Sequence, residues 1–383
     1  MTDLFTLLRQ LAVARPDGSA AAARAADLIA RTLAGTGVTP VRESFFLRPH
    51  LPVLTGLAML LLAAGAAAAV WRRKRIPAVL LALAIPLVYL GEFEFNLPIV
   101  SWLGGRTGEN IVAEYGPADT GRTLILAAHY DTKTEVFDHE QRKPIHNAVP
   151  YAMLLIFLAA ILGALGRVLP ALDREWPRRL LMLMAAGGIA GLSLLAYAFG
   201  GAYFLRAKSP GARDDGTSVA ILLGVAQGLA KGEIDPGRTR VRLVFFGGEE
   251  VNMQGSQAYA ARHRAELNRA AMINLETLSG PGPYRYHRRT GTFLRKFASS
   301  VLMRDLLNAA LAAKGLPAAK PAGAIYDDSM PFAARGVPVI TASNGTGRDS
   351  YHNAGDSLDK VVPGRMEEAV GVIGEMVKEW GSR

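Results

Sequence analysis

Four long apolar runs place the strongest constraint on what this chain can fold into. They cover residues 51–71, 76–91, 150–169 and 180–205, and their charged residues are confined to the ends. A helix of about 20 apolar residues can cross the hydrocarbon core of a bilayer. Short polar segments at 72–75 and 171–179 separate the runs into two pairs. We therefore predict four transmembrane helices in two hairpins, over residues 51–99 and 146–206. The alternative is a buried helix pair in a large soluble core.

The net charge of +10 has a local origin. Part of it is the basic run at residues 72–75, between two apolar runs, where basic residues mark the cytoplasmic side of a membrane protein. A second basic and aromatic cluster covers residues 284–296. It is interpreted either as a solvated loop entering a helix or as a contact with anionic lipid headgroups. We therefore expect a lipid bilayer, and no nucleic acid, among the partners.

The N-terminal residues resemble no secretory signal. They are amphipathic and lack a basic region followed by an uninterrupted apolar core. Internal segments would therefore direct the chain into a membrane.

Outside the apolar runs, short apolar strands alternate with amphipathic helices. This alternation predicts an α/β fold, in which a mainly parallel sheet has helices on both faces. The soluble fold would be assembled from residues 1–50, 100–145 and 207–383. Within its last part, residues 292–315 read as one long helix.

The composition limits the chemistry of any metal site. The chain contains no cysteine, so disulfides, thiolate ligands and a cysteine nucleophile are excluded. A metal would be held by His, Asp and Glu, and two histidines with several carboxylates form a set that suits zinc. A site with two close metal ions also needs a carboxylate that bridges them and a base for the attacking water.

Five fragments carry such side chains, mostly where a predicted strand ends. Open α/β sheets build their sites at these strand ends. Each fragment alone has an ordinary explanation, since carboxylates at a helix start can simply cap that helix. The fragments lie at residues 128–131, 210–218, 245–250, 274–276 and 351–353.

In this order, the five fragments resemble the motifs of the M28 zinc peptidases, the family of bacterial leucyl-type aminopeptidases and glutamate carboxypeptidase II. The early segment 15–33 also resembles the N-terminal helix of that family. The resemblance covers residues 1–50, about 105–140 and 207–383, so the apolar hairpins read as insertions. It implies two Zn²⁺ ions per chain and five metal ligands: His129, Asp214, Glu250, Glu276 and His352.

The resemblance also implies a role for each of these side chains. His129 and Glu276 would bind one zinc ion, Glu250 and His352 would bind the other, and Asp214 would bridge the two.

Three further residues receive catalytic roles from the same resemblance. Glu249 would be the general base that moves a proton from the bridging water to the leaving amine. Asp131 would orient His129. Tyr351 would help to stabilise the oxyanion.

The sequence departs from the family pattern at three positions. Glu276 stands where soluble members usually have Asp, and Arg213 stands where a small or acidic residue is common. Ser329 replaces a bulkier residue, which bears on substrate preference more than on catalysis.

We therefore expect a membrane-bound aminopeptidase that hydrolyses N-terminal residues of peptides. Its location would be the bacterial inner membrane, with the catalytic part on the extracytoplasmic side. One alternative is a transferase like glutaminyl cyclase with a single zinc ion, in which the pairing of His129 with Glu276 would not be needed. Another is a membrane binding protein with a degenerate peptidase fold. The sequence leaves the preferred residue and the oligomeric state open.

Overall fold

The computed structural model describes residues 3–117, 121–137, 139–345 and 351–382. The chain divides into two compact units. The first, here called the α/β unit, comprises Met1–Pro49, Arg106–Thr134 and Ala207–Arg383. The second, the helical unit, comprises His50–Gly105 and Glu135–Arg206. Each unit is formed from segments that are distant in the sequence.

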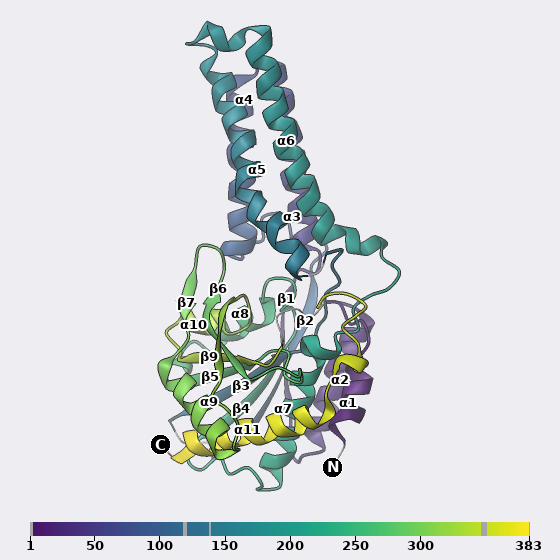
Figure 1. Ribbon diagram of the computed structural model, residues 1–383, viewed down its shortest axis with the longest axis vertical. Coiled ribbons are helices and arrows are strands. Elements are labelled where there is room, and N and C mark those ends of the chain that lie inside the picture. Colours follow the sequence, from purple (N-terminus) through teal and green to yellow (C-terminus); the bar gives the residue numbers. More distant parts are fainter. Residues whose placement is uncertain (1–2, 118–120, 138, 346–350, 383) are drawn as a thin grey trace. The chain divides into compact units, whose positions relative to one another are not determined.

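A mixed nine-stranded sheet is the centre of the α/β unit, with the strand order β1-β2-β4-β3-β5-β9-β6-β7 and β8 paired to β6 (Figure 1). The strands are β1 (Val41–Leu47), β2 (Arg106–Tyr115), β3 (Thr123–His129), β4 (Arg240–Phe246), β5 (Ala270–Leu275), β6 (Arg285–Gly291), β7 (Lys296–Ala298), β8 (Lys320–Ile325) and β9 (Val339–Ser343). Strands β4, β3, β5 and β9 are parallel, whereas β2 and β6 pair with this group antiparallel. The predicted α/β class is confirmed.

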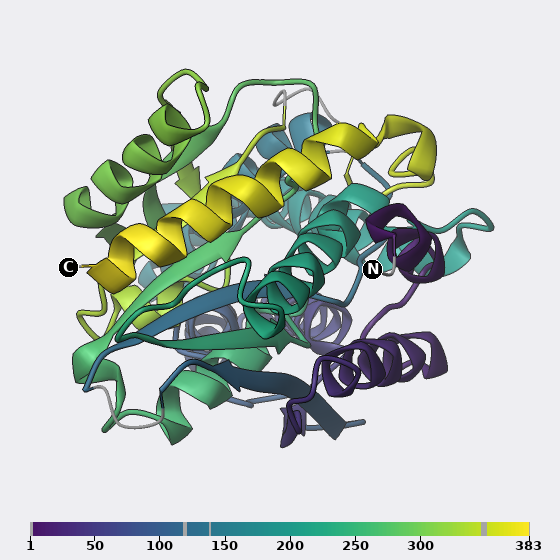
Figure 2. The same ribbon diagram turned by 90° about the horizontal axis from the view of Figure 1, so that it is seen from below.

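Helices cover both faces of this sheet (Figure 2). In strand β3, Leu124 and Leu126 pack into one core cluster, and Ile125 packs into the other. This alternation follows from the strand period of two residues. The first core contains residues of α1 (Leu4–Leu11), α2 (Ala20–Ala34), α7 (Thr217–Ala230), α9 (Val301–Ala313) and α11 (Pro363–Ser382). The second contains residues of α8 (Gln254–Arg262) and α10 (Met330–Ala333).

The prediction of one long helix over residues 292–315 is wrong. Strand β7 and the turn before it occupy its first part, and α9 begins only at Val301. Ser300 ends the extended segment, because its hydroxyl caps α9 by accepting a hydrogen bond from the N–H of Met303. Strand β6 had no strand-like alternation in the sequence, because four of its seven residues are basic or histidine. Its assignment depends on pairing with β9, which is distant in the chain.

Within the part of the chain that the structure describes, the helical unit contains four helices long and apolar enough to cross a membrane. They are α3 (Leu51–Trp71), α4 (Arg75–Tyr89) with its π-helical extension η1 (Leu90–Glu94), α5 (His139–Leu165) and α6 (Glu175–Gly200). The two connecting turns lie at the same end of this bundle (Figure 1). There Arg75 pairs with Asp173 at 2.6 Å, and Arg178 donates to the carbonyl of Trp71 at 2.9 Å.

The bundle is packed on small side chains and is apolar on its outside. Its buried positions include Ala63, Ala66, Ala159 and Ala160, which let the helices approach closely. Large apolar side chains are exposed instead, such as Leu61, Ile76, Leu80, Leu87 and Leu183. A surface of this kind is costly in water.

Candidate metal centre

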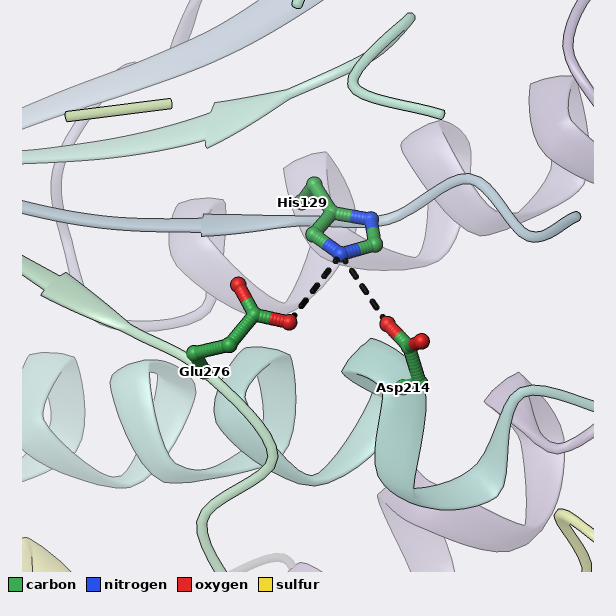
Figure 3. Close-up of side chains that lie close together, drawn as sticks. All are labelled: His129, Asp214 and Glu276. Atoms are coloured by element: carbon green, nitrogen blue, oxygen red, sulfur yellow. Dashed lines mark ion pairs between the residues drawn. The ribbon is translucent and has the colours of Figure 1, made fainter. Parts of the chain in front are cut away.

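His129 stands at the end of β3, and two carboxylates converge on its outer ring nitrogen (Figure 3). Nε2 of His129 lies 3.3 Å from Oδ1 of Asp214 and 3.9 Å from Oε1 of Glu276. Asp214 comes from the kinked turn η4 (Ala212–Gly216), in which its own backbone is not helical, and Glu276 directly follows β5. On the other side of the ring, Nδ1 lies 3.5 Å from Oδ1 of Asp131. The imidazole is therefore held between carboxylates on both edges.

His352 forms a second cluster that shares Asp214 with the first. Its Nε2 lies 3.2 Å from Oδ2 of Asp214 and 3.2 Å from Oε1 of Glu250. The two oxygens of Asp214 thus face different histidines. The structure brings together all five side chains that the sequence analysis nominated as ligands, in two sets that each contain Asp214.

The geometry of both clusters fits zinc. Zinc binds His and carboxylate ligands at about 2.0–2.2 Å in a tetrahedral arrangement, so two ligands of one ion are separated by about 3.3–3.5 Å. Most of the spacings above agree with that value, and that between His129 and Glu276 is slightly longer. The ligand atoms of each set all lie within 4.8 Å of one another. A carboxylate that presents its two oxygens to two such sets can bridge two ions.

Two carboxylates without an assigned role hold the turn that carries Asp214. Asp356 accepts hydrogen bonds from the N–H groups of Arg213 and Asp214, at 2.9 and 3.1 Å. Asp215 accepts from the N–H of Thr277 at 3.0 Å and so ties this turn to the segment after β5. Sequence reasoning missed both roles, although Asp215 directly follows a nominated ligand. They depend on contacts between distant segments.

Asp131 connects the two clusters. Its Oδ1 faces His129, and it accepts hydrogen bonds from the N–H groups of Glu249 and Glu250, at 3.3 and 2.9 Å. Asp17, which the sequence analysis did not single out, holds the same turn by accepting from the N–H of Gly248 at 2.9 Å. The positions of the nominated base and of its neighbouring ligand therefore depend on carboxylates from two other segments, of which Asp131 is fully buried.

A fully buried arginine, Arg15, supports this region from the N-terminal segment. Its guanidinium donates to the carbonyls of Tyr130 at 2.5 Å, Pro210 at 2.8 Å and Gly211 at 2.9 Å. These carbonyls flank the segments that carry His129 and Asp214. Burial lowers the pKa of Arg15, although nearby carboxylates including Asp131 oppose that shift. The RPDG segment that separates the first two helices is thus part of the site's support.

The electrostatics of the centre favour a bound cation. Burial among other carboxylates raises the pKa of Glu249 well above its ordinary value, and it raises the pKa of Glu276 to about 7. Burial alone would lower the pKa of His129, but Glu249 and the carboxylates around the ring raise it well above its usual range. A divalent cation bound there would neutralise this concentration of negative charge and would compete with protons for the same carboxylates.

Tyr351, the nominated oxyanion residue, lies against Arg213. The guanidinium donates to the Tyr351 hydroxyl at 3.2 Å, and its central carbon lies 5.4 Å from the ring centre. This pairing gives the unusual arginine before Asp214 a place in the site. A phenol that accepts from an arginine keeps its own proton for donation to another oxygen.

Residues 198–377 match the model of Peptidase family M28. The leucine aminopeptidase precursor from Bacteroides thetaiotaomicron is similar in structure, with a TM-score of 0.58 and 11% identity over 98% of this chain and 94% of that chain. The aminopeptidase from Aneurinibacillus sp. strain AM-1 has a TM-score of 0.55 and 14% identity over 98% of this chain and 92% of that chain. The Porphyromonas gingivalis glutaminyl cyclase has a TM-score of 0.54 and 15% identity over 99% of this chain and 96% of that chain. No curated protein matches by sequence.

These comparisons confirm the resemblance to the M28 peptidases, and the structural ones confirm the fold. The family match supports a metallopeptidase and therefore a hydrolase. Glutaminyl cyclases share the fold with the aminopeptidases, so similarity in fold is compatible with either reaction.

Proposed function

We propose that this chain, with its M28 match over residues 198–377, is a membrane-bound two-zinc aminopeptidase. One observation carries the proposal: the two carboxylate oxygens of Asp214 face His129 and His352 at 3.3 and 3.2 Å. Glu276 would complete one zinc site, and Glu250 would complete the other. A single shared carboxylate between two histidine sites is the arrangement that a pair of close metal ions requires.

Zinc bound there would polarise the substrate carbonyl and make a water molecule acidic enough to act as a nucleophile at neutral pH. The residues of the chain account for the proton transfers. The carboxylate of Glu249 accepts a proton from the water and passes it to the leaving amine. The hydroxyl of Tyr351 donates to the oxygen of the attacked carbonyl, while Arg213 holds that hydroxyl in place.

The glutaminyl cyclases among the structural neighbours support a second candidate. Such a transferase would need one zinc ion and would cyclise an N-terminal glutamine without consuming water. The presence of the His129–Glu276 pair in addition to the His352–Glu250 pair favours hydrolysis, because a site with one metal ion does not need both pairs. A degenerate binding protein would need neither the full set nor the base Glu249.

The membrane part of the proposal is supported by the helical unit. Its four helices are long and apolar enough to span, and their outward faces are apolar. Helix α3 has 21 residues and is therefore about 31 Å long, close to the thickness of the hydrocarbon core. Trp71 and Trp176 are exposed near the turns, as is common at a membrane interface.

The two turns support a proposal for the sidedness. A chain that crosses twice returns to its starting side, so all segments of the α/β unit share one side of the membrane. The turns carry Arg72, Arg73, Lys74, Arg75, Arg174, Arg178 and Arg179. Basic residues in short loops remain in the cytoplasm. We therefore propose that the α/β unit is extracytoplasmic, in a bacterial inner membrane, and acts on peptides there.

The test combines metal analysis of the purified protein with three substrates. A free aminoacyl anilide, the same anilide with a blocked amine and a glutaminyl peptide distinguish the candidates. The proposal expects about two zinc ions per chain and hydrolysis of the free anilide alone. Pyroglutamate formation with one zinc ion would support the cyclase instead. Absence of both metal and turnover would support a binding protein.

A further inference from the structure

Strands β6 and β7 form an antiparallel hairpin with a short turn at residues 292–295. Gly291, just before the turn, has φ of +138°, and a Cβ atom at this position would lie 2.0 Å from the carbonyl oxygen of Arg295. Glycine is therefore required there. The Thr292 hydroxyl accepts a hydrogen bond from the N–H of Arg295 at 3.1 Å and closes the turn. The turn thus has a defined shape.

This turn exposes two large apolar side chains to the outside. Phe293 is 68% exposed and Leu294 is 55% exposed. Folding normally buries such residues, and burial of each in an apolar medium is favourable. Val301 and Leu302, at the start of α9 just after the hairpin, are exposed as well. The hairpin therefore ends in an apolar tip.

The apolar tip lies within a strongly cationic segment. Between Glu276 and Asp305 the sequence contains no acidic residue and six basic ones: Arg285, Arg288, Arg289, Arg295, Lys296 and Arg304. Of these, Arg288, Arg289 and Lys296 are exposed on the hairpin strands. A hairpin with cations along its strands and an aromatic–aliphatic tip has the character of a membrane-surface element.

We propose that the β6–β7 hairpin docks on anionic phospholipids. Phe293 and Leu294 enter the headgroup region, and the flanking cations bind lipid phosphates. This inference rests on the proposed membrane embedding and is independent of the proposed hydrolysis. An acidic protein segment could satisfy the cations, but an exposed Phe–Leu pair is accommodated by a bilayer without a matching pocket. The four apolar helices, if they span a bilayer as proposed, would hold this chain at a lipid surface.

The chain itself makes the test simple, because it contains no cysteine. Phe293→Cys in the full-length protein gives a single thiol for an environment-sensitive fluorophore. Ala313→Cys, exposed at the far end of α9, is the matched control. Both are reconstituted into phosphatidylcholine bilayers with and without phosphatidylglycerol, and lipid-attached quenchers report depth. Resistance to carbonate extraction is checked first, so that a failure of the embedding is recognised separately.

The proposal expects a blue shift and lipid quenching at position 293 that increase with phosphatidylglycerol, and neither at position 313. Replacing Arg288, Arg289 and Lys296 by glutamine should reduce the docked state roughly fivefold per cation removed. The same replacement at Arg24, Lys231 and Arg264, which are also exposed, should leave it unchanged. A label at 293 that stays in water in both bilayers would overturn the proposal. So would shielding without lipid quenching, which would indicate a protein contact.

Discussion

The carboxylate of Asp131 accepts a hydrogen bond from the backbone N–H of Glu250 at 2.9 Å. The same carboxylate lies 3.5 Å from Nδ1 of His129. Burial would raise the pKa of Asp131, but the interaction with His129 and the hydrogen bonds with Asp17 and the N–H of Glu250 together lower it. One negatively charged side chain therefore orients a nominated ligand of each proposed zinc ion.

Replacing Asp131 with Asn keeps the size of the side chain and removes its charge. We expect zinc affinity to fall about 10- to 100-fold, because partners that orient metal-bound histidines have effects of that size. Competition with a chelator of known affinity measures the change. Asp305→Asn, at an exposed position, is the control. Unchanged zinc affinity in Asp131→Asn would mean that the His129 ring is oriented by other contacts.

Glu249→Gln should separate catalysis from metal binding. The amide cannot accept the proton of the attacking water, so hydrolysis should fall about 10²- to 10⁴-fold. Zinc content should stay at the wild-type level, because Glu249 lies outside both ligand sets. Glu367→Gln, exposed on α11, controls for the substitution itself. Retention of substantial activity would remove Glu249 from the role of base.

The topology can be read from labelled cysteines and reporter fusions. Single cysteines at Ala171, in the second turn, and at Lys231, in the α/β unit, are both exposed. A membrane-impermeant maleimide added to intact spheroplasts should label only position 231. Alkaline phosphatase fused after Arg383 should be active, whereas green fluorescent protein exported through the Sec route should stay dark. The reverse pattern would place the α/β unit in the cytoplasm.

His263 and Glu43 link α8 to strand β1, with Nε2 and Oε1 2.7 Å apart. The hydrogen bond to Glu43 raises the pKa of His263. Burial would raise the pKa of Glu43, but the hydrogen bonds and charges of His263 and Arg262 together lower it. The His263 contribution to stability is complete below its unfolded pKa of about 6.5 and is lost as the pH rises through its folded pKa. The Glu43 contribution is lost as the pH falls through its lowered pKa.

The pair should therefore stabilise the α/β unit most between about pH 4.3 and 6.5. We expect His263→Gln to lower the melting temperature more at pH 6 than at pH 9, as thermal unfolding in detergent would show. An equal loss at both pH values would indicate that His263 acts through packing alone.

The sequence predicted the parts of the fold that depend on local pattern. The apolar lengths around Leu61 and Leu183 indicated the long helices, and the alternation of short apolar strands with amphipathic helices indicated the α/β sheet. The hairpin around Phe293 was not predicted, because strand pairing between β6 and β9 is a long-range contact that overrides the local helical pattern. Residue-level propensity contains no information on such pairing.

The candidate site shows the same division. His129, Asp214 and Glu276 were recognisable because each lies within a short sequence fragment, and the order of these fragments along the chain resembles that of the family motifs. Arg15 and Asp17 were not recognisable, because their role is to form hydrogen bonds with backbone carbonyl and N–H groups that come close to them only after folding. Both residues lie in the RPDG segment between α1 and α2, and a Pro- and Gly-containing turn of that kind has many other causes.

The claim that two zinc ions share Asp214 is tested most directly by metal content. Wild-type protein and Asp214→Asn are purified side by side in zinc-buffered medium, with Asp305→Asn as the control, and zinc per chain is measured by mass spectrometry. The account predicts about two ions in wild type and in the control. It predicts loss of both ions in Asp214→Asn, since the neutral amide no longer screens their mutual repulsion. An Asp214→Asn protein that binds as much zinc as wild type, with the same affinity, would contradict the account.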